Sequence, residues 1–160
     1  MKHLIPEFMA MRRRFPEGFE SSLVLPCLRR IQEDRGYVAD EDIAQLADYL
    51  EVPRIQIEEV LSFYGQFRRA PVGRCHIEMC RNVSCSLLGA ERLIDHFSRR
   101  LGIKPGETTA DGQFSLATVE CMASCGTAPM VVVNGAYHES MDAAKADAII
   151  ESHRQDRAAE

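Results

Sequence analysis

Apolar residues in the N-terminal part of the chain recur at intervals of three and four, the spacing that places them on one face of a helix. One helix is expected to start at Ser21 or Ser22 and to stop at Gly36, because glycine commonly ends helices. A second is expected from Asp40 and a third directly after Pro53. These three amphipathic segments predict a small helical bundle.

The helical periodicity leads into the aromatic pair Phe63 and Tyr64, which we expect in the bundle core, and it breaks at residues 68–73. The break divides the chain into an N-terminal helical bundle, 1–68, and a second domain, 69–160. The elements expected in the second domain are strand 74–79, helix 86–101, strands 114–120 and 130–134, and helix 142–153. The order β-α-β-β-α predicts a thioredoxin-like layer, so the expected fold class is α+β or α/β.

Composition narrows the possible functions. The chain has 160 residues and is 46% apolar, enough for a packed core. Its 19 basic and 24 acidic residues give a net charge of −5, and no basic stripe joins aromatic residues, so nucleic acid is not an expected partner. No apolar run approaches the roughly 20 residues needed to cross a bilayer, and no secretory signal is evident. We expect a cytoplasmic protein without direct membrane insertion.

The cytoplasm is reducing, which disfavours disulfides. The six cysteines are therefore expected to bind metal or to pack in the core. Four of the six form two close pairs, Cys80 with Cys85 and Cys121 with Cys125, each beside an apolar run that predicts a strand. The four thiols are therefore expected to converge from two loops at strand ends. Cys85 is expected directly before a helix, where the orphan N–H groups favour a thiolate.

The other two cysteines have a different pattern. Alternation along the first strand places Cys75 on the buried face with Ile77 and Met79, whereas Cys80 has the opposite parity. Cys27 lies on the apolar face of a predicted helix and is expected to be a packing residue.

The spacing within the two pairs favours an iron–sulfur cluster. Structural zinc sites commonly use two cysteines separated by two residues, whereas four and three residues separate the cysteines here. A thioredoxin-type redox disulfide requires Cys-x-x-Cys at the start of a helix, which is absent. Four residues separate the first pair in plant-type ferredoxins, which bind a 2Fe-2S cluster. Zinc and oxidised or unliganded thiols remain as alternatives.

The residues beside these cysteines suit a negatively charged cluster. Arg81 is placed to add positive charge. Small side chains allow backbone N–H groups to approach the sulfurs. These small residues are Ser84, Ser86, Ala123, Ser124 and Gly126.

Several motifs together resemble one known family. They are Ser62-Phe63-Tyr64, Met79-Cys80-x4-Cys85-x3-Gly89-Ala90, Gly106-x-Thr108-Thr109-x-Asp111-Gly112-x-Phe114-x-Leu116 and Glu120-Cys121-x3-Cys125-x2-Ala128-Pro129-Met130. The combination resembles the small 2Fe-2S subunit of NADH:quinone oxidoreductase, the E subunit of bacterial complex I. The resemblance extends from about Phe15 to Ile150.

The resemblance implies an electron-transfer subunit of an oxidoreductase, with an N-terminal helical bundle followed by a thioredoxin-like ferredoxin domain. It implies one 2Fe-2S cluster with four ligands: Cys80, Cys85, Cys121 and Cys125. It also implies a partner flavoprotein that binds FMN and NADH and performs the hydride chemistry, within a larger respiratory complex peripheral to the inner membrane. This chain itself contains no predicted catalytic residue. The family usually has glycine where this chain has Ala123, a difference expected to change a backbone angle or a contact to the cluster and to leave the ligands in place.

Other functions stay open at this point. The same module resembles the small subunits of NAD-reducing hydrogenases and of NAD-dependent formate dehydrogenases. A structural zinc-binding interaction module is an alternative of a different class. A thiol–disulfide oxidoreductase on a thioredoxin-like fold is a third, although its motif is missing.

Overall fold

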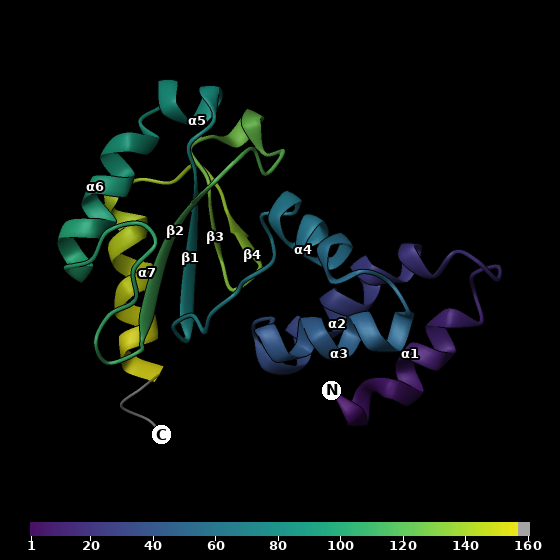
Figure 1. The fold of residues 1–160 in the computed structure, drawn as a ribbon. Helices are drawn as coiled ribbons and strands as arrows, with labels where there is room; N and C mark the ends of the chain where they lie inside the picture. Colours follow the sequence, from purple (N-terminus) through teal and green to yellow (C-terminus); the bar gives the residue numbers. More distant parts are fainter. Residues whose placement is uncertain (157–160) are drawn as a thin grey trace. The chain divides into compact units, whose positions relative to one another are not determined.

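A computed structural model describes residues 1–156, and its internal contacts divide the chain into two compact units. The first unit is Met1–Pro71 and the second begins at Val72. This division falls three residues beyond the expected domain boundary after residue 68. The last residues of the expected second domain, 157–160, lie outside the described part. Figure 1 shows the elements of each unit.

The first unit is entirely helical. Its elements are η1 (Lys2–Leu4), α1 (Ile5–Arg12), η2 (Glu20–Leu23), α2 (Val24–Arg35), α3 (Asp40–Leu50) and α4 (Arg54–Phe63). The last three confirm the three predicted helices, whereas α1 was not predicted. Pro6 interrupts the apolar pattern there, but it lies in the first turn of α1, where its missing N–H does not break the helix.

The two ends of α2 can be compared with the glycine stop and the serine cap that the sequence predicted. Gly36 adopts a left-handed conformation with φ 88° and ends α2 as predicted. The predicted serine cap of α2 is wrong, because Ser21 and Ser22 lie within η2 and Leu23 occupies the capping position. The buried core of this unit includes Leu23, Cys27, Leu28, Ile31, Ile43, Leu46, Leu50, Ile57 and Leu61.

The expected burial of Phe63 and Tyr64 is wrong. Phe63 is 80% exposed and Tyr64 is 40% exposed. In α4 the core-facing residues Ile57 and Leu61 are one turn apart, and Phe63 follows Leu61 by two residues, which turns it about 200° away. Tyr64 has left the helix altogether, with an extended backbone.

The second unit is a mixed layer of strands and helices. Its elements are β1 (Cys75–Cys80), α5 (Val83–Leu87), α6 (Ala90–Leu101), β2 (Phe114–Val119), η3 (Cys125–Thr127), β3 (Val131–Val133), β4 (Ala136–His138) and α7 (Ala143–Asp156). The sheet order is β2-β1-β3-β4, with β1 parallel to β2 and the other pairs antiparallel. Helices α6 and α7 contact each other and lie on one face of the sheet (Figure 1).

The two faces of β1 separate two groups of cysteine. Cys75, Ile77 and Met79 are buried in one core, which also contains Phe97 of α6 and Ile150 of α7. Cys80 belongs to a different buried cluster on the opposite face. The alternation along β1 therefore places these side chains as the sequence predicted.

The helix predicted over residues 86–101 is divided in two. Gly89 lies between α5 and α6 with φ 101°, a left-handed conformation that favours glycine and turns the chain sharply. As a consequence Leu87, within the range of the predicted helix, is 82% exposed. Cys85 lies within α5 rather than before the first turn of a helix.

The strand β4 was also not predicted. It follows β3 through a tight turn at Asn134 and Gly135, both with positive φ, and it is only three residues long. Tyr137 lies in this strand. Among the described residues, no helix is both long and apolar enough to cross a membrane.

Candidate metal centre

The parallel pairing of β1 with β2 brings the two cysteine-bearing loops together. In this register Cys80 lies opposite Val119, so both strands end at the same edge of the sheet. The backbone N–H of Arg81 then donates to the carbonyl oxygen of Val119 at 3.2 Å. Cys85 follows in α5, and on the other side Cys121 and Cys125 follow β2.

Glu120 connects the two loops through its side chain. Its carboxylate accepts a hydrogen bond from Asn82 Nδ2 at 3.3 Å and lies 3.5 Å from Arg81 Nη2. Arg81, expected to contribute positive charge, is therefore paired with a carboxylate. In the sequence Glu120 stands out only as part of a motif, although its position at the end of the second parallel strand is a usable signal for this contact.

The four predicted ligands lie near one another. The Sγ atoms of Cys121 and Cys125 are 3.5 Å apart. Burial raises the pKa of Cys85, and its neighbours Cys80 and Cys125 raise it further, while a backbone hydrogen bond with Met130 acts in the opposite direction. Cys85 thus interacts with a thiol of its own loop and with a thiol of the other loop.

The distance between the two exposed thiols suits metal binding by a thiolate pair. Two sulfurs that bind one tetrahedral metal at about 2.3 Å are roughly 3.8 Å apart, close to the separation of Cys121 and Cys125. In addition, the N–H of Ala123 donates to Cys121 Sγ at 3.4 Å, as expected for a small residue beside a negatively charged sulfur. Within residues 1–156, no group of three or more His, Cys, Asp or Glu side chains is arranged to hold a single metal ion.

Ala123 has an unusual backbone for its residue type. Its φ of 63° is in the left-handed region, which glycine adopts without a steric cost. Ala123 therefore adopts, with a Cβ present, a conformation that glycine adopts without strain. In this conformation the N–H of Ala123 is directed at Cys121 Sγ.

The two remaining cysteines are separate from this site. Cys27 is buried in the helical unit, and Cys75 is buried between the sheet and its helices. Burial raises the pKa of each thiol to about 12, so both stay protonated at neutral pH. A protonated thiol is a poor metal ligand, and the packing role expected for both fits this surrounding.

Glu139 contacts the loop of the second pair from outside it. The residue precedes α7, and its carboxylate accepts a hydrogen bond from Ser124 Oγ. The hydrogen bond from Ser124, followed by one from Thr127, lowers the pKa of Glu139. The sequence offered no signal for this contact, because 15 residues separate its partners.

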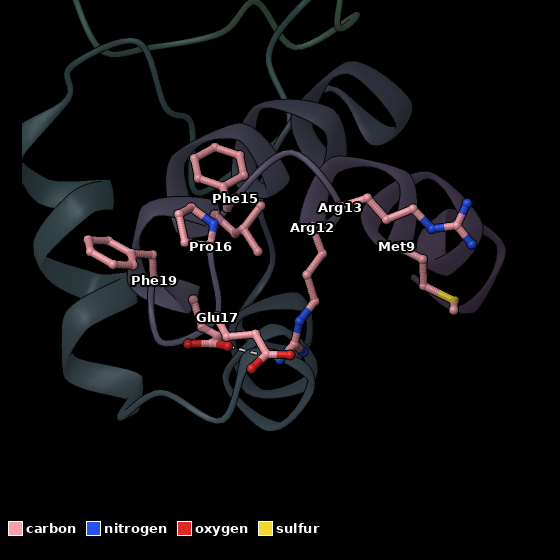
Figure 2. Close-up of a pocket in the computed structure, with 9 residues that line it drawn as sticks. Met9, Arg12, Arg13, Phe15, Pro16, Glu17 and Phe19 are labelled. Atoms are coloured by element: carbon pink, nitrogen blue, oxygen red, sulfur yellow. Dashed lines mark hydrogen bonds and ion pairs between the residues drawn. The ribbon is translucent and has the colours of Figure 1, made fainter.

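A pocket lies in the helical unit, near the C-terminal end of α1. Figure 2 shows this pocket of about 350 Å³, where Arg12 Nη2 pairs with Glu20 Oε1 at 2.9 Å. Aromatic and basic side chains, including Phe15 and Phe19, surround it, and no cysteine lines it. This pocket is therefore separate from the two cysteine pairs.

Comparison with known proteins decides the family. Residues 9–154 match the family described as thioredoxin-like 2Fe-2S ferredoxin. The chain belongs to this family. Membership confirms the predicted fold class and the predicted cofactor, one 2Fe-2S cluster.

Relatives within the family share most of their length with this chain. The E 2 subunit of the NADH-quinone oxidoreductase of Rhizobium meliloti is 40% identical over 92% of this chain and 87% of its own length. NADH-quinone oxidoreductase subunit 2 of Thermus thermophilus is 39% identical over 84% of this chain and 75% of its own. These relatives confirm the resemblance on which the sequence-based expectations rested.

One solved structure is similar over most of this chain. It is an NAD+-reducing NiFe-hydrogenase in the air-oxidised state, with a TM-score of 0.70 and 27% sequence identity. The similarity covers 81% of this chain but only 23% of the hydrogenase chain. This chain thus corresponds to about a quarter of that longer polypeptide.

Proposed function

We propose that this chain is the 2Fe-2S electron-transfer subunit of an NADH:quinone oxidoreductase. Relatives named as subunits of that enzyme are 34–40% identical to it over most of its length. The structural observation that carries the proposal is the meeting of two thiol pairs at the carboxyl edge of β1 and β2. This makes the chain part of an oxidoreductase without a catalytic residue of its own.

The ligands in this proposal are the four cysteines of the two pairs: Cys80, Cys85, Cys121 and Cys125. The 3.5 Å separation of Cys121 Sγ and Cys125 Sγ would allow both thiolates to hold the cluster from one side, and Cys80 and Cys85 would hold it from the other. Once bound, a 2Fe-2S cluster supplies one-electron transfer.

The chain's own residues position and shield this site. Cys80 and Cys85 are buried among Ala90, Met130 and Val132, which exclude water from one side. Cys121 and Cys125 are exposed, so the other side faces the surface, where a redox partner can approach. The Glu120 carboxylate contacts Asn82 and Arg81 and so joins the two loops at the surface.

The partner in the proposal is a flavoprotein that binds FMN and NADH. Hydride transfer requires two electrons at one centre, which a one-electron carrier does not provide, so that chemistry is assigned to the partner. The proposal also places the chain in the cytoplasm, peripheral to the inner membrane through the larger complex. The names of the relatives support this assignment.

A second candidate is the corresponding subunit of an NAD-reducing hydrogenase. The similarity to the hydrogenase structure, with a TM-score of 0.70, favours it over the formate dehydrogenase alternative. Its sequence identity of 27% is below the 40% shared with the Rhizobium meliloti relative, so it ranks second.

Co-purification tests the choice of complex. The tagged chain is expressed in its native host, and the proteins that remain bound are identified. We expect a flavoprotein together with quinone-reducing subunits, and we expect NADH to bleach the visible absorption of the cluster in the isolated complex. Hydrogenase subunits in their place would support the second candidate. A complex whose cluster NADH does not reduce would contradict both.

A further inference from the structure

The loop that carries Cys121 and Cys125 is attached to the segment between β4 and α7. The backbone N–H of Ser140 donates to the carbonyl oxygen of Thr127 at 2.7 Å. The N–H of Met141 donates to the carbonyl oxygen of Pro129 at 2.8 Å. These two bonds join the end of the loop to a segment that leads directly into a helix.

The side chain of Glu139 adds a further attachment nearer the thiols. Its carboxylate accepts a hydrogen bond from Ser124 Oγ, and Ser124 Oγ lies 2.8 Å from Thr127 Oγ1. Ser124 directly precedes Cys125, and Thr127 ends the short helix η3 that Cys125 begins. The carboxylate therefore holds both ends of the turn that presents the Cys125 thiol.

The thiols of this turn are less enclosed than those of the first pair, although its neighbours Met122 and Ala128 pack against the apolar cluster. Cys121 and Cys125 are exposed, whereas Cys80 and Cys85 are enclosed by apolar residues. Glu139 itself comes from a segment braced by Lys145, whose Nζ donates to the carbonyl oxygens of Glu139 and Ser140 at 3.2 and 2.8 Å. The carboxylate is thus presented from a fixed backbone.

The charge of this carboxylate has a second consequence. Hydrogen bonds from hydroxyl groups lower the pKa of Glu139, so it is ionised at neutral pH. Reduction adds a negative charge to a cluster, and a fixed negative charge nearby makes that addition less favourable. Glu139 is therefore expected to oppose reduction of a cluster bound by the neighbouring thiols.

We propose that Glu139 is a positioning residue that holds the Cys121–Cys125 turn in its metal-binding shape and, through its negative charge, lowers the reduction potential of the cluster. The proposal rests on the ligand set proposed above. It assigns two separable roles to one side chain, a hydrogen-bond role and a charge role.

Three variants of the full chain separate these roles. Glu139→Gln keeps an acceptor oxygen and removes the charge, Glu139→Ala removes both, and Ser124→Ala removes a donor and keeps the charge. Glu151→Gln is the matched control, since Glu151 is exposed and lies eight residues into α7, about 12 Å along the helix axis. The readouts are the midpoint potential, the rate of iron release to a chelator, and amide hydrogen exchange at Ser140 and Met141.

We expect Glu139→Gln to raise the midpoint potential, by up to the 59 mV that corresponds to a tenfold change in a one-electron equilibrium. Its iron-release rate should stay within about twofold of the wild type, because the acceptor remains. Glu139→Ala should raise the potential and also release iron at least several-fold faster. Ser124→Ala should speed release with a smaller change in potential.

Equal midpoint potentials in Glu139→Gln, Glu151→Gln and the wild type would overturn the charge role. Unchanged exchange at Ser140 and Met141 in Glu139→Ala would overturn the positioning role. The exchange measurement uses the chain as purified, so it reports on the turn whether or not iron is bound. Absence of iron and sulfide from the wild type would instead refute the proposed ligand set, which distinguishes that failure from the other two.

Discussion

The two thiol pairs of the candidate site are held in different ways. Cys80 and Cys85, 3% and 2% exposed, come from a strand and a helix and pack with Ala90, Met130 and Val132. Apolar burial fixes this half, and the same burial raises the pKa of Cys85. Metal binding must then compensate for forming a thiolate in an apolar surrounding.

Cys121 and Cys125 are exposed, and hydrogen bonds hold their loop together with the packing of its partly buried residues Met122 and Ala128. The N–H of Ala123 contacts Cys121 Sγ, and the Glu139 carboxylate holds the turn at Cys125 through Ser124. Hydrogen bonds at an exposed site each contribute little net stability. The comparison indicates that the first pair is the stable half of the site and the second pair the adjustable half.

The largest expected effect separates ligands from packing cysteines. Replacement of any one cysteine of the two pairs by serine should abolish the cluster, because each removes a thiolate ligand. Cys27→Ser and Cys75→Ser should keep the cluster, at a stability cost of about 1–3 kcal/mol for a buried hydroxyl. Iron and sulfide content after anaerobic purification measures the difference. Full loss of the cluster in Cys75→Ser alone would contradict the ligand assignment.

A second prediction concerns the packing that supports the first pair. Val132→Ala removes two buried methyl groups beside Cys80 and should lower the free energy of unfolding by about 2 kcal/mol. The matched control is Val83→Ala, because Val83 is exposed on α5, and its effect should stay within about 0.5 kcal/mol. Denaturant unfolding of the two variants measures both values. Equal losses of stability in Val132→Ala and Val83→Ala would show that burial does not stabilise the half of the site that holds Cys80 and Cys85.

A third prediction concerns the backbone of the second pair. Ala123→Gly should stabilise the chain by up to about 1 kcal/mol, because glycine avoids the steric cost of the left-handed conformation but also loses more entropy on folding. Ala117→Gly within β2 is the control and should destabilise it by about 0.5–1 kcal/mol. Unfolding experiments on both variants give the sign. Destabilisation by Ala123→Gly would mean that the turn does not need this conformation.

The smallest expected effect is a pH dependence confined to the turn at Cys125. Hydrogen bonds from Ser124 and Thr127 lower the pKa of Glu139 below its ordinary value of 4.5. Its stabilising contribution is therefore present above that value and is lost as the pH falls through the lowered pKa. At neutral pH the Ser140 N–H should be better protected from exchange in the wild type than in Glu139→Ala. In acid the protection in the two proteins should become equal. A difference that persists at low pH would exclude the carboxylate as its source.

Sequence reasoning succeeds where neighbouring residues determine the structure. The alternation of β1 separates Cys75 from Cys80, and Gly36 marks the end of α2. It fails at Gly89, where the apolar spacing of α6 extends backwards through a glycine that breaks the helix. Gly89 is the signal for this break in the sequence, but the prediction gave more weight to the apolar pattern.

Other features depend on contacts between residues far apart in the sequence. The strand β4 has only three residues and pairs through a turn, so it has too few positions to show a period. The hydrogen bond between Ser124 and Glu139 depends on the pairing of β3 with β4, because these two strands separate the residues along the chain. The four candidate thiols can therefore be picked out from the sequence, whereas the way the second pair is held cannot.

The metal content of the site is the most direct test of the proposed function. The full chain is purified without oxygen, iron, acid-labile sulfide and zinc are quantified, and paramagnetic resonance spectra are recorded before and after dithionite. We predict about two irons and two sulfides per chain, with a spin-half signal that appears only on reduction. Stoichiometric zinc with no such signal would contradict the electron-transfer function and favour a structural zinc module.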